Sequence, residues 1–229
     1  MKQRIVIEMD DLNFSSIELK YLIQIREHIP QFKVTCFTIP MHPWLMEDTK
    51  RFEQYKLWTD MLKDNSDWLE IAVHGYMHDK SEMVTSYENA KTNILASQRM
   101  FTKFKVQEKR RFFGSKWVHY KTEVPYVKVF KGAGWMMSTE AYEAARDLGY
   151  TVAVDRNQPK PTVPGLKMYR YNWSIEEPFP QDFAVIKGHG HMLGMGNDLA
   201  MNYQKLLQDL PTDAEYLTVS EYLKLYGPD

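Results

Sequence analysis

The chain has little of what marks several large classes of protein. It has one cysteine among 229 residues, so an internal disulfide is excluded, and Cys36 lies in an apolar stretch where a small buried hydrophobe is expected. The formal net charge is −1, which indicates neither a nucleic-acid footprint nor an attraction to anionic membranes. No apolar run is long enough to span a membrane, and the N-terminus does not resemble a signal peptide. We therefore expect a cytoplasmic protein with neither nucleic acid nor membrane as a partner.

The remaining composition is that of an ordinary globular protein. Hydrophobic residues make up 44% of the chain and charged residues 26%. Aromatic residues reach 14%; most of them are expected in the core, and some can line a cleft that binds sugar rings. No linker, repeat or low-complexity tract divides the chain, so we expect a single domain over residues 1–229.

Strand-like and helix-like segments alternate along the chain. We expect strands at residues 4–9, 32–39, 68–73, 109–118, 126–130, 150–154, 167–171 and 182–187, and helices at 16–28, 50–63, 82–104, 138–148 and 197–209; the segment 216–219 and a terminal helix close the chain. Such alternation predicts a mainly parallel sheet of the α/β class. About seven or eight strands favour an irregular (β/α)7–8 barrel over an open sheet.

Side chains with metal-binding chemistry follow two of these strands. His74 and His78 come directly after the strand at 68–73, and Asp10 and Asp11 end the first strand. Residues just past the carboxyl ends of parallel strands converge on one rim. Two imidazoles and a carboxylate can hold a divalent ion and leave positions open for water and substrate. The natural division of the aspartate pair is one metal ligand and one general base. Zinc is the default ion, and nickel, cobalt or iron suit the same ligands.

A third group of candidates follows the apolar strand near residue 186. His189 and His191 flank Gly190 in a glycine-rich stretch that can be read as a flexible turn or as part of a site. A histidine there could protonate a leaving group, because its ordinary pKa lies near neutrality.

The order of these motifs resembles the polysaccharide deacetylase family, the NodB-homology domain of carbohydrate esterase family 4. The matching segments are residues 9–11, 35–39, 74–78, 130–135 and 185–189, and the resemblance spans roughly residues 4–225. It implies that three residues bind the metal: Asp11, His74 and His78. It also implies that Asp10 is the general base and His189 the general acid, with His191 as the competing choice.

The sequence departs from the family's pattern at three positions. Lys131 stands where the family has an arginine that orients the base, and Ala133 stands where it has a proline. Lysine keeps the charge without the planar fork of arginine. Asn172 lies near the family's Asp/Trp segment, and an amide cannot tune a histidine as a carboxylate does. Aromatic residues in or beside the motifs are the expected substrate contacts: Tyr76, Trp135 and Trp173.

These observations predict a metal-dependent hydrolase that removes N-acetyl groups from a sugar or a related amide by way of metal-activated water. Three alternatives stay open. The substrate could be another non-peptide C–N bond, such as a small or cyclic amide. The departures at Lys131, Ala133 and Asn172 would also suit a carbohydrate-binding relative with weak catalysis. Two histidines and a carboxylate also occur in non-haem iron oxygenases, although these usually use antiparallel double sheets. The expected partner is a carbohydrate or a small acetylated substrate, and the oligomeric state is left open.

Overall fold

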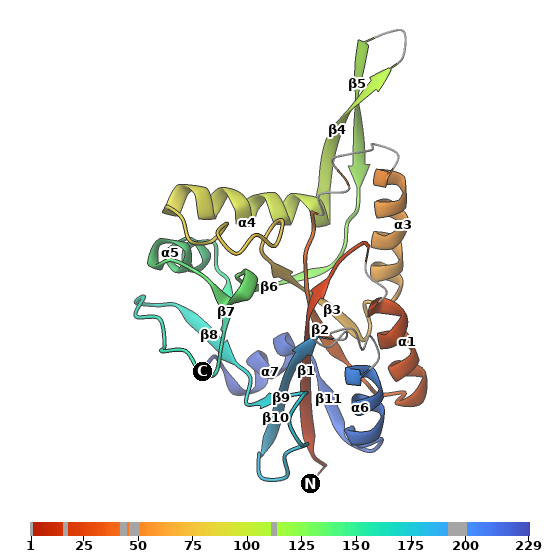
Figure 1. Ribbon diagram of the computed structural model, residues 1–229, viewed down its shortest axis with the longest axis vertical. Coiled ribbons are helices and arrows are strands. Elements are labelled where there is room, and N and C mark those ends of the chain that lie inside the picture. The colour runs from red at the N-terminus through yellow and green to blue at the C-terminus, as the bar shows by residue number, and fades with distance from the viewer. Residues whose placement is uncertain (1, 16–17, 42–44, 46–50, 111–113, 192–200) are drawn as a thin grey trace.

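The computed structural model describes residues 2–15, 18–41, 45, 51–110, 114–191 and 201–229 (Figure 1). Its main sheet has nine strands, eight of them in the order β8-β7-β6-β3-β2-β1-β10-β9, with β11 paired to β1. All of the pairings in this sheet are parallel. The two strands at the ends of that order, β8 and β9, are separated by only two residues of chain, so the sheet curls back toward itself. The predicted irregular, mainly parallel α/β barrel is confirmed.

The described residues form these elements in chain order: β1 (Arg4–Leu12), α1 (Glu18–His28), β2 (Val34–Thr38), α3 (Arg51–Asp64), β3 (Leu69–His74), α4 (Tyr87–Thr102), β4 (Lys103–Arg110), β5 (Gly114–Lys121), β6 (Tyr126–Lys131), η1 (Ala133–Trp135), α5 (Thr139–Asp147), β7 (Thr151–Val154), β8 (Lys167–Arg170), β9 (Trp173–Ser174), β10 (Val185–His191), α6 (Met201–Asp209), β11 (Glu215–Leu217) and α7 (Val219–Tyr226). The helices expected to begin at residues 16, 50 and 197 start outside the described residues, and their described parts are helical.

The sheet buries both of its faces. Ile5 and Ile7 of β1 belong to the large core between the strands and the helices, whereas Val6 belongs to a smaller core inside the curve with Tyr169 and Tyr222. Successive side chains of a strand point to opposite faces, which explains this division. The first residues of α7 donate backbone N–H groups to Thr35 and Glu70, which lie near the starts of β2 and β3, so α7 covers the amino-terminal end of the curved sheet. The opposite end, where the strands have their carboxyl termini, carries the candidate site.

One region differs from the sequence-based prediction. The expected helix over 82–104 ends at Thr102, and the expected strand over 109–118 is replaced by two antiparallel strands, β4 and β5. The backbone N–H groups of Thr122 and Val124 donate to the carbonyls of Thr102 and Phe101, which fastens the returning strand to the end of α4. Such long-range bonds are invisible to a local hydrophobic period. Figure 1 shows the resulting hairpin projecting from the body of the molecule.

Strand β10 also differs from its prediction, because it runs to His191 instead of ending near residue 187. Its register pairs His189 with Glu8 and His191 with Asp10 of β1. The interpretation of this glycine-rich segment as a turn is therefore wrong, and the two histidines are strand residues. Packing explains the glycine at position 188, because a Cβ there would lie 2.7 Å from the ring of Trp173.

No helix in the described part of the chain combines the length and the apolar character that a membrane span requires.

Candidate active site

The end of β1 is distorted in a way that brings two carboxylates to the rim. The register of β1 against β2 shifts between Met9 and Leu12, and Asp11 has a φ of 67°, in the left-handed region. A non-glycine residue in this conformation is costly, and such residues concentrate at functional sites. The bulge re-aims the side chain of Asp11, so that Asp10 and Asp11 approach the same group, His74.

The structure brings Asp11, His74 and His78 together at this rim. The Nε2 atoms of His74 and His78 lie 3.3 Å and 3.0 Å from Asp11 Oδ1. One ligand atom from each of the three residues can be chosen so that all lie within 4.8 Å of one another. Their side chains come from the ends of β1 and β3 and from the loop after β3, as the rule for parallel strands predicts. Their role as metal ligands stays a prediction.

The hydrogen bonding of this triad fits a bound cation. His74 Nδ1 lies 3.2 Å from the carbonyl oxygen of Lys131, so Nδ1 carries the proton and Nε2 presents a lone pair. Asp11 Oδ1, which faces that lone pair, is buried and has no hydrogen-bond partner. Two acceptors that face each other in a buried place are costly unless a cation lies between them. A carbonyl that orients a ligating imidazole is also usual at metal sites.

Hydrogen bonds with Glu82 and Ser97 hold the loop that follows His74 in place. Gly75 has a φ of 65°, and a Cβ there would lie 1.7 Å from a carboxylate oxygen of Glu82. That carboxylate accepts hydrogen bonds from the backbone N–H groups of Tyr76 and Met77, each at 3.0 Å. Ser97 of α4 donates to the carbonyl of Gly75 at 2.9 Å. Glu82 was not singled out from the sequence, because nothing in a local pattern shows which backbone groups a distant carboxylate will reach.

Lys131 lies between two buried carboxylates beside the triad. Its Nζ donates to Asp10 Oδ1 at 2.6 Å and to Glu8 Oε1 at 2.8 Å, and the lysine is fully buried. The ammonium also lies 3.9 Å and 4.2 Å from the ring centres of Phe37 and Trp135. Lysine therefore occupies the place expected for the orienting arginine and makes the expected contact with Asp10.

These charges decide the ionisation of the two aspartates. Burial alone would raise the pKa of Asp10, but the ammonium of Lys131, which donates a hydrogen bond to this carboxylate, outweighs burial and lowers that pKa to about 2. Burial would also raise the pKa of Asp11, but its contacts with His74 and His78 hold it well below its usual range. Both carboxylates are therefore ionised near neutral pH.

Glu8 is a site residue that the sequence analysis missed. It is fully buried, and its Oε1 lies 2.9 Å from His189 Nδ1 as well as 2.8 Å from Lys131 Nζ. A carboxylate only accepts hydrogen bonds, so it selects the His189 tautomer with a proton on Nδ1. Glu8 lies two residues before Asp10 and therefore faces the same side of β1. A charged residue in an otherwise apolar buried strand was the available signal.

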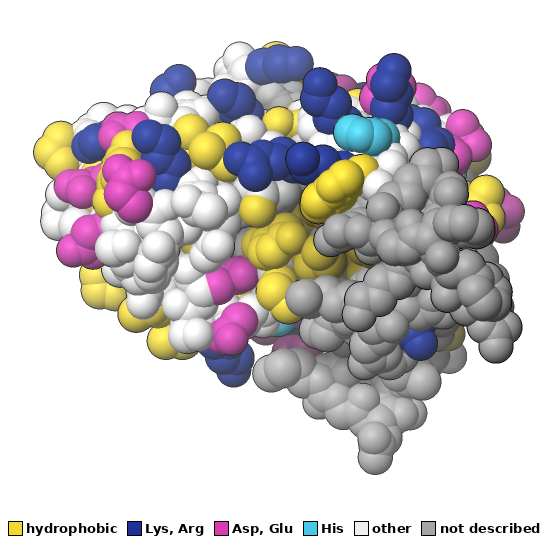
Figure 2. Space-filling view, turned by 90° about the horizontal axis from the view of Figure 1, so that it is seen from above, with side chains coloured by type: hydrophobic (Ala, Val, Ile, Leu, Met, Phe, Trp, Pro, Cys, Tyr) yellow, Lys and Arg dark blue, Asp and Glu magenta, His cyan; other side chains and the backbone are white. Residues whose placement is uncertain are grey.

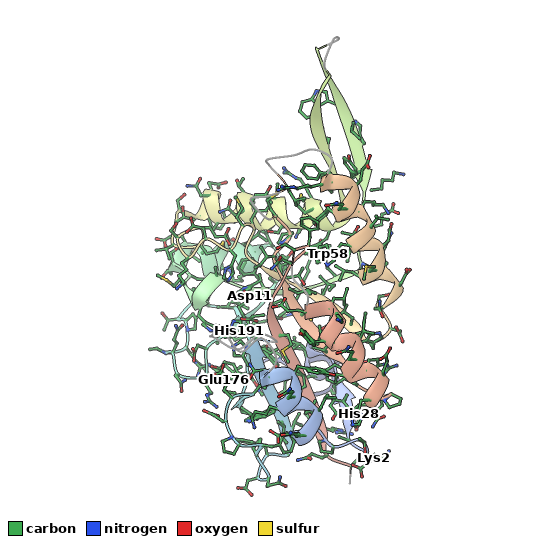
Figure 3. The ribbon with its side chains drawn as sticks, turned by 45° about the vertical axis from the view of Figure 1, so that its right-hand side comes forward. Lys2, Asp11, His28, Trp58, Glu176 and His191 are labelled. Atoms are coloured by element: carbon green, nitrogen blue, oxygen red, sulfur yellow. The ribbon has the colours of Figure 1, made fainter. Side chains whose placement is uncertain are left out.

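The two histidines of β10 have different surroundings. His189 is 7% exposed and packs beside Tyr171 and Trp135, with ring centres 4.6 Å and 5.0 Å apart. His191 lies nearer the rim, where its Nε2 is 3.4 Å from Asp11 Oδ2 (Figure 3). Burial lowers the pKa of His191, and the nearby Asp10 and Asp11 oppose this shift.

The expected substrate contacts divide between the rim and the core. Trp135 covers Lys131, and Tyr76 lines a cavity beside the histidine loop. Trp173 is 2% exposed and packs against Phe179, so its ring lies in the core. Asn172 bonds through its side chain to the backbone of residues 185 and 187 and so joins the segment between β8 and β9 to β10. Substrate contact by Tyr76, Trp135 and Trp173 stays a prediction.

Comparisons with known proteins show which solved structures share this fold. Neither a protein-family model nor a curated protein matches the sequence. Solved structures do match across nearly the whole chain. The chitin deacetylase of the fungal pathogen Colletotrichum lindemuthianum has a TM-score of 0.57 at 14% identity, over 96% of this chain and 87% of the other. A family 4 carbohydrate esterase domain of a xylanase from the hindgut metagenome of Trinervitermes trinervoides has a TM-score of 0.53 at 15% identity, over 100% and 93%.

A third match is instructive about activity. A mutant of a family 4 pseudoenzyme, with restored enzymatic activity, has a TM-score of 0.53 at 13% identity, over 97% of this chain and 68% of the other. The chain thus has the fold of the family 4 carbohydrate esterases, and the resemblance read from its motifs is confirmed at the level of the fold. Because this fold includes a pseudoenzyme, activity has to be argued from the side chains.

Proposed function

We propose that this protein is a metal-dependent deacetylase that hydrolyses the N-acetyl group of a sugar or a related amide, with residues 1–229 acting as a single catalytic domain. The observation that carries the proposal is the convergence of three candidate ligands: one ligand atom from each of Asp11, His74 and His78 lies within 4.8 Å of the others, and Asp11 Oδ1 is 3.3 Å and 3.0 Å from the Nε2 atoms of His74 and His78. The fold supports the same class of reaction, since one of its solved representatives is a chitin deacetylase.

Asp11, His74 and His78 would hold the ion, with zinc as the first candidate and nickel, cobalt or iron as alternatives. When bound, a divalent ion supplies Lewis acidity and lowers the pKa of a coordinated water. Asp10 is then placed to accept the proton of the attacking water, because Lys131 keeps it ionised and holds one oxygen while the other lies 3.7 Å from His74 Nε2. Lys131 is the positioning residue for this base.

We further propose that His191 protonates the departing amine and that His189 supports the base. The side chain of His191 is 29% exposed and lies beside Asp11, so a substrate at the rim can reach it. His189 is 8% exposed at its side chain and is held by Glu8 one layer deeper. Replacing each with glutamine separates the roles: His191→Gln should lower kcat by about a hundredfold or more, and His189→Gln by less. A larger loss in His189→Gln would reverse the assignment.

The decisive experiment combines elemental analysis of the purified protein with acetate release from acetylated sugars and small amides. His74→Ala should lose bound metal and lower acetate release by more than about a hundredfold, since losing even a partner of a metal ligand costs up to that much. His28→Ala, at an exposed position in α1, is the matched control and should change neither.

Full acetate release by a metal-free His74→Ala protein would refute the proposal. Metal and sugar binding without acetate release from any acetylated amide would support the alternative of a carbohydrate-binding relative. The pairing of Lys131 with Asp10 argues for turnover, because the base keeps a cationic partner despite the departure from arginine.

A further inference from the structure

The hairpin of β4 and β5 differs in charge from the rest of the molecule. Between residues 99 and 121 the sequence has eight lysines and arginines and one acidic residue, whereas the whole chain has 29 basic and 30 acidic residues. The near-neutral total therefore conceals a strongly basic segment. Clustered cations of this kind attract anionic partners over distances of about a Debye length.

The register of the hairpin gathers these cations on one face. Lys103 pairs with Lys121 and Lys105 pairs with His119, so all four side chains share a face, and all four are exposed. Like charges directly opposite each other destabilise a strand pair. Among the residues whose side chains are described, which leave out 106–116, no carboxylate forms an ion pair with Lys103, Lys105 or Lys121. An anionic ligand on this face would relieve that repulsion.

A cavity of about 950 Å³ lies at the base of this hairpin. That volume is at the upper end of the range of about 300–1,000 Å³ that is usual for ligand sites. Its walls combine aromatic rings, among them Phe52, Phe104 and Trp117, with the cations Arg99 and Lys103. Figure 2 shows a band of Lys and Arg side chains that runs beside an exposed hydrophobic patch.

Trp117 is the most accessible of these rings. It is 51% exposed, and the ammonium of Lys105 lies 4.7 Å from its ring centre. An exposed flat ring with a cation beside it suits a sugar ring that carries a carboxylate, because the ring packs on the apolar sugar face and the cation pairs with the acid.

The cavity adjoins the candidate active site. Tyr76 is one of its lining residues, and it lies in the chain midway between the metal-ligand candidates His74 and His78. Residues two apart are separated by at most about 7 Å. Met41, which also lines the cavity, donates its backbone N–H to the carbonyl of Tyr76 at 3.0 Å. The cavity and the candidate metal ligands therefore share one loop, the one that carries Tyr76.

We propose that the basic face of the hairpin and the cavity at its base bind an acidic polysaccharide, so that the substrate is an N-acetylated glycan that carries carboxylates. The inference rests on the proposed function, because it names the substrate class of the same site. The hairpin holds the carboxylates and packs a ring against the sugar, and the rim receives a neighbouring acetylated residue.

Isothermal titration calorimetry on the full chain tests this with two oligosaccharides of equal length. Hyaluronan fragments alternate glucuronate and N-acetylglucosamine, whereas chito-oligosaccharides contain only neutral N-acetylglucosamine. Hyaluronan should bind about tenfold more tightly at low salt, and the preference should disappear near 1 M salt, where the Debye length is about 3 Å. Equal affinities at low salt would overturn the proposal.

Variants locate the binding face. The triple change Lys103→Ser, Lys105→Ser and Lys121→Ser should weaken hyaluronan binding about tenfold, since each exposed charge pair contributes modestly. The matched control removes the same charge from exposed lysines elsewhere: Lys20→Ser, Lys160→Ser and Lys224→Ser. The control should bind hyaluronan as the unmodified protein does, and an equal loss in both variants would overturn the assignment to the hairpin.

The same titration is repeated with two other anionic ligands. Tighter binding of a thymidine oligonucleotide or of phosphatidylserine vesicles than of hyaluronan would overturn the proposal in favour of that partner. Acetate release is recorded separately. Hyaluronan binding with no acetate release from any substrate leaves the assignment of an acidic-polysaccharide site to the hairpin standing and removes the proposed function. Acetate release from chito-oligosaccharides with no preference for hyaluronan does the reverse.

Discussion

Two clusters of polar side chains lie at opposite ends of the curved sheet, and their hydrogen bonding differs. The amino-end cluster surrounds one carboxylate beneath α7 and consists of Thr35, Glu70, Thr218 and Ser220. The carboxyl-end cluster adjoins the candidate metal ligands and consists of Glu8, Asp10, Lys131 and His189. Glu8 and Asp10 lie in a largely apolar interior, where an unpaired charge is costly, whereas Glu70 is half-buried.

The amino-end cluster is fully satisfied. One oxygen of Glu70 accepts from the hydroxyl of Thr35 at 2.8 Å and from the backbone N–H of Ser220 at 3.1 Å. The other accepts from the hydroxyl of Thr218 at 3.1 Å and from that of Ser220. A carboxylate at the N-terminus of α7 is also favoured by the helix dipole. These bonds join the N-terminus of α7 to β2 and β3.

The carboxyl-end cluster keeps polar atoms without partners. Glu8 Oε2 and, beside the cluster, Asp11 Oδ1 are buried without a hydrogen bond. Folds tolerate such groups where function requires them.

The largest effect expected at either end follows from removing the buried ammonium. Lys131→Met leaves Glu8 and Asp10 as neighbouring buried carboxylates without a cation, and it should lower the free energy of unfolding by about 3–5 kcal/mol. Lys187→Met is the amino-end counterpart. Its partner Asp229 is 22% exposed at its side chain, so water can replace the lost contact and the cost should be about 1 kcal/mol. Urea denaturation of both variants measures the difference, and equal costs would contradict the contrast.

The next effect concerns turnover. Glu8→Gln should lower kcat by about a hundredfold with little change in KM or in metal content, because it removes the charge that holds His189 and Lys131 in place. The pH–rate profile should shift as well, which a purely structural role would not produce. Glu70→Gln is the matched control at the amino end, and its kcat should be unchanged. A shared loss of activity in both variants would show that Glu8 acts only through stability.

The third effect is acid sensitivity. The pKa of Asp10 is about 2 in the folded protein against an ordinary value of 3.8, so its ionised form stabilises the fold above about pH 4. That contribution, about 2 kcal/mol, should disappear as the pH falls from about 4 to about 2. Asp10→Asn should therefore lose about 2 kcal/mol less over this interval, as measured by urea denaturation at each pH. Parallel losses in the variant and the unmodified protein would contradict the assignment.

Much of the fold could be predicted because its signals are local. Alternating segments and apolar runs such as residues 68–73 predicted the parallel sheet, and polar residues just past strand ends predicted where Asp11, His74 and His78 meet. The hairpin was missed for the opposite reason. Lys103 and Phe104 fit the helical period of the preceding segment, and only pairing with residues 120 and 121 makes them a strand.

The amino-acid sequence by itself determined the barrel class, the strands whose ends form the rim and the residue types that meet there. These features depend on the hydrophobic period of each segment and on the order of the segments, and both can be read from the sequence. Only the tertiary structure decided that Glu8 is the partner of His189, that Lys131 reaches Asp10 and that the basic hairpin stands beside the histidine loop. These contacts join residues up to about 180 positions apart, and they depend on strand register. Register is set by the packing of whole strands, so no single segment contains it.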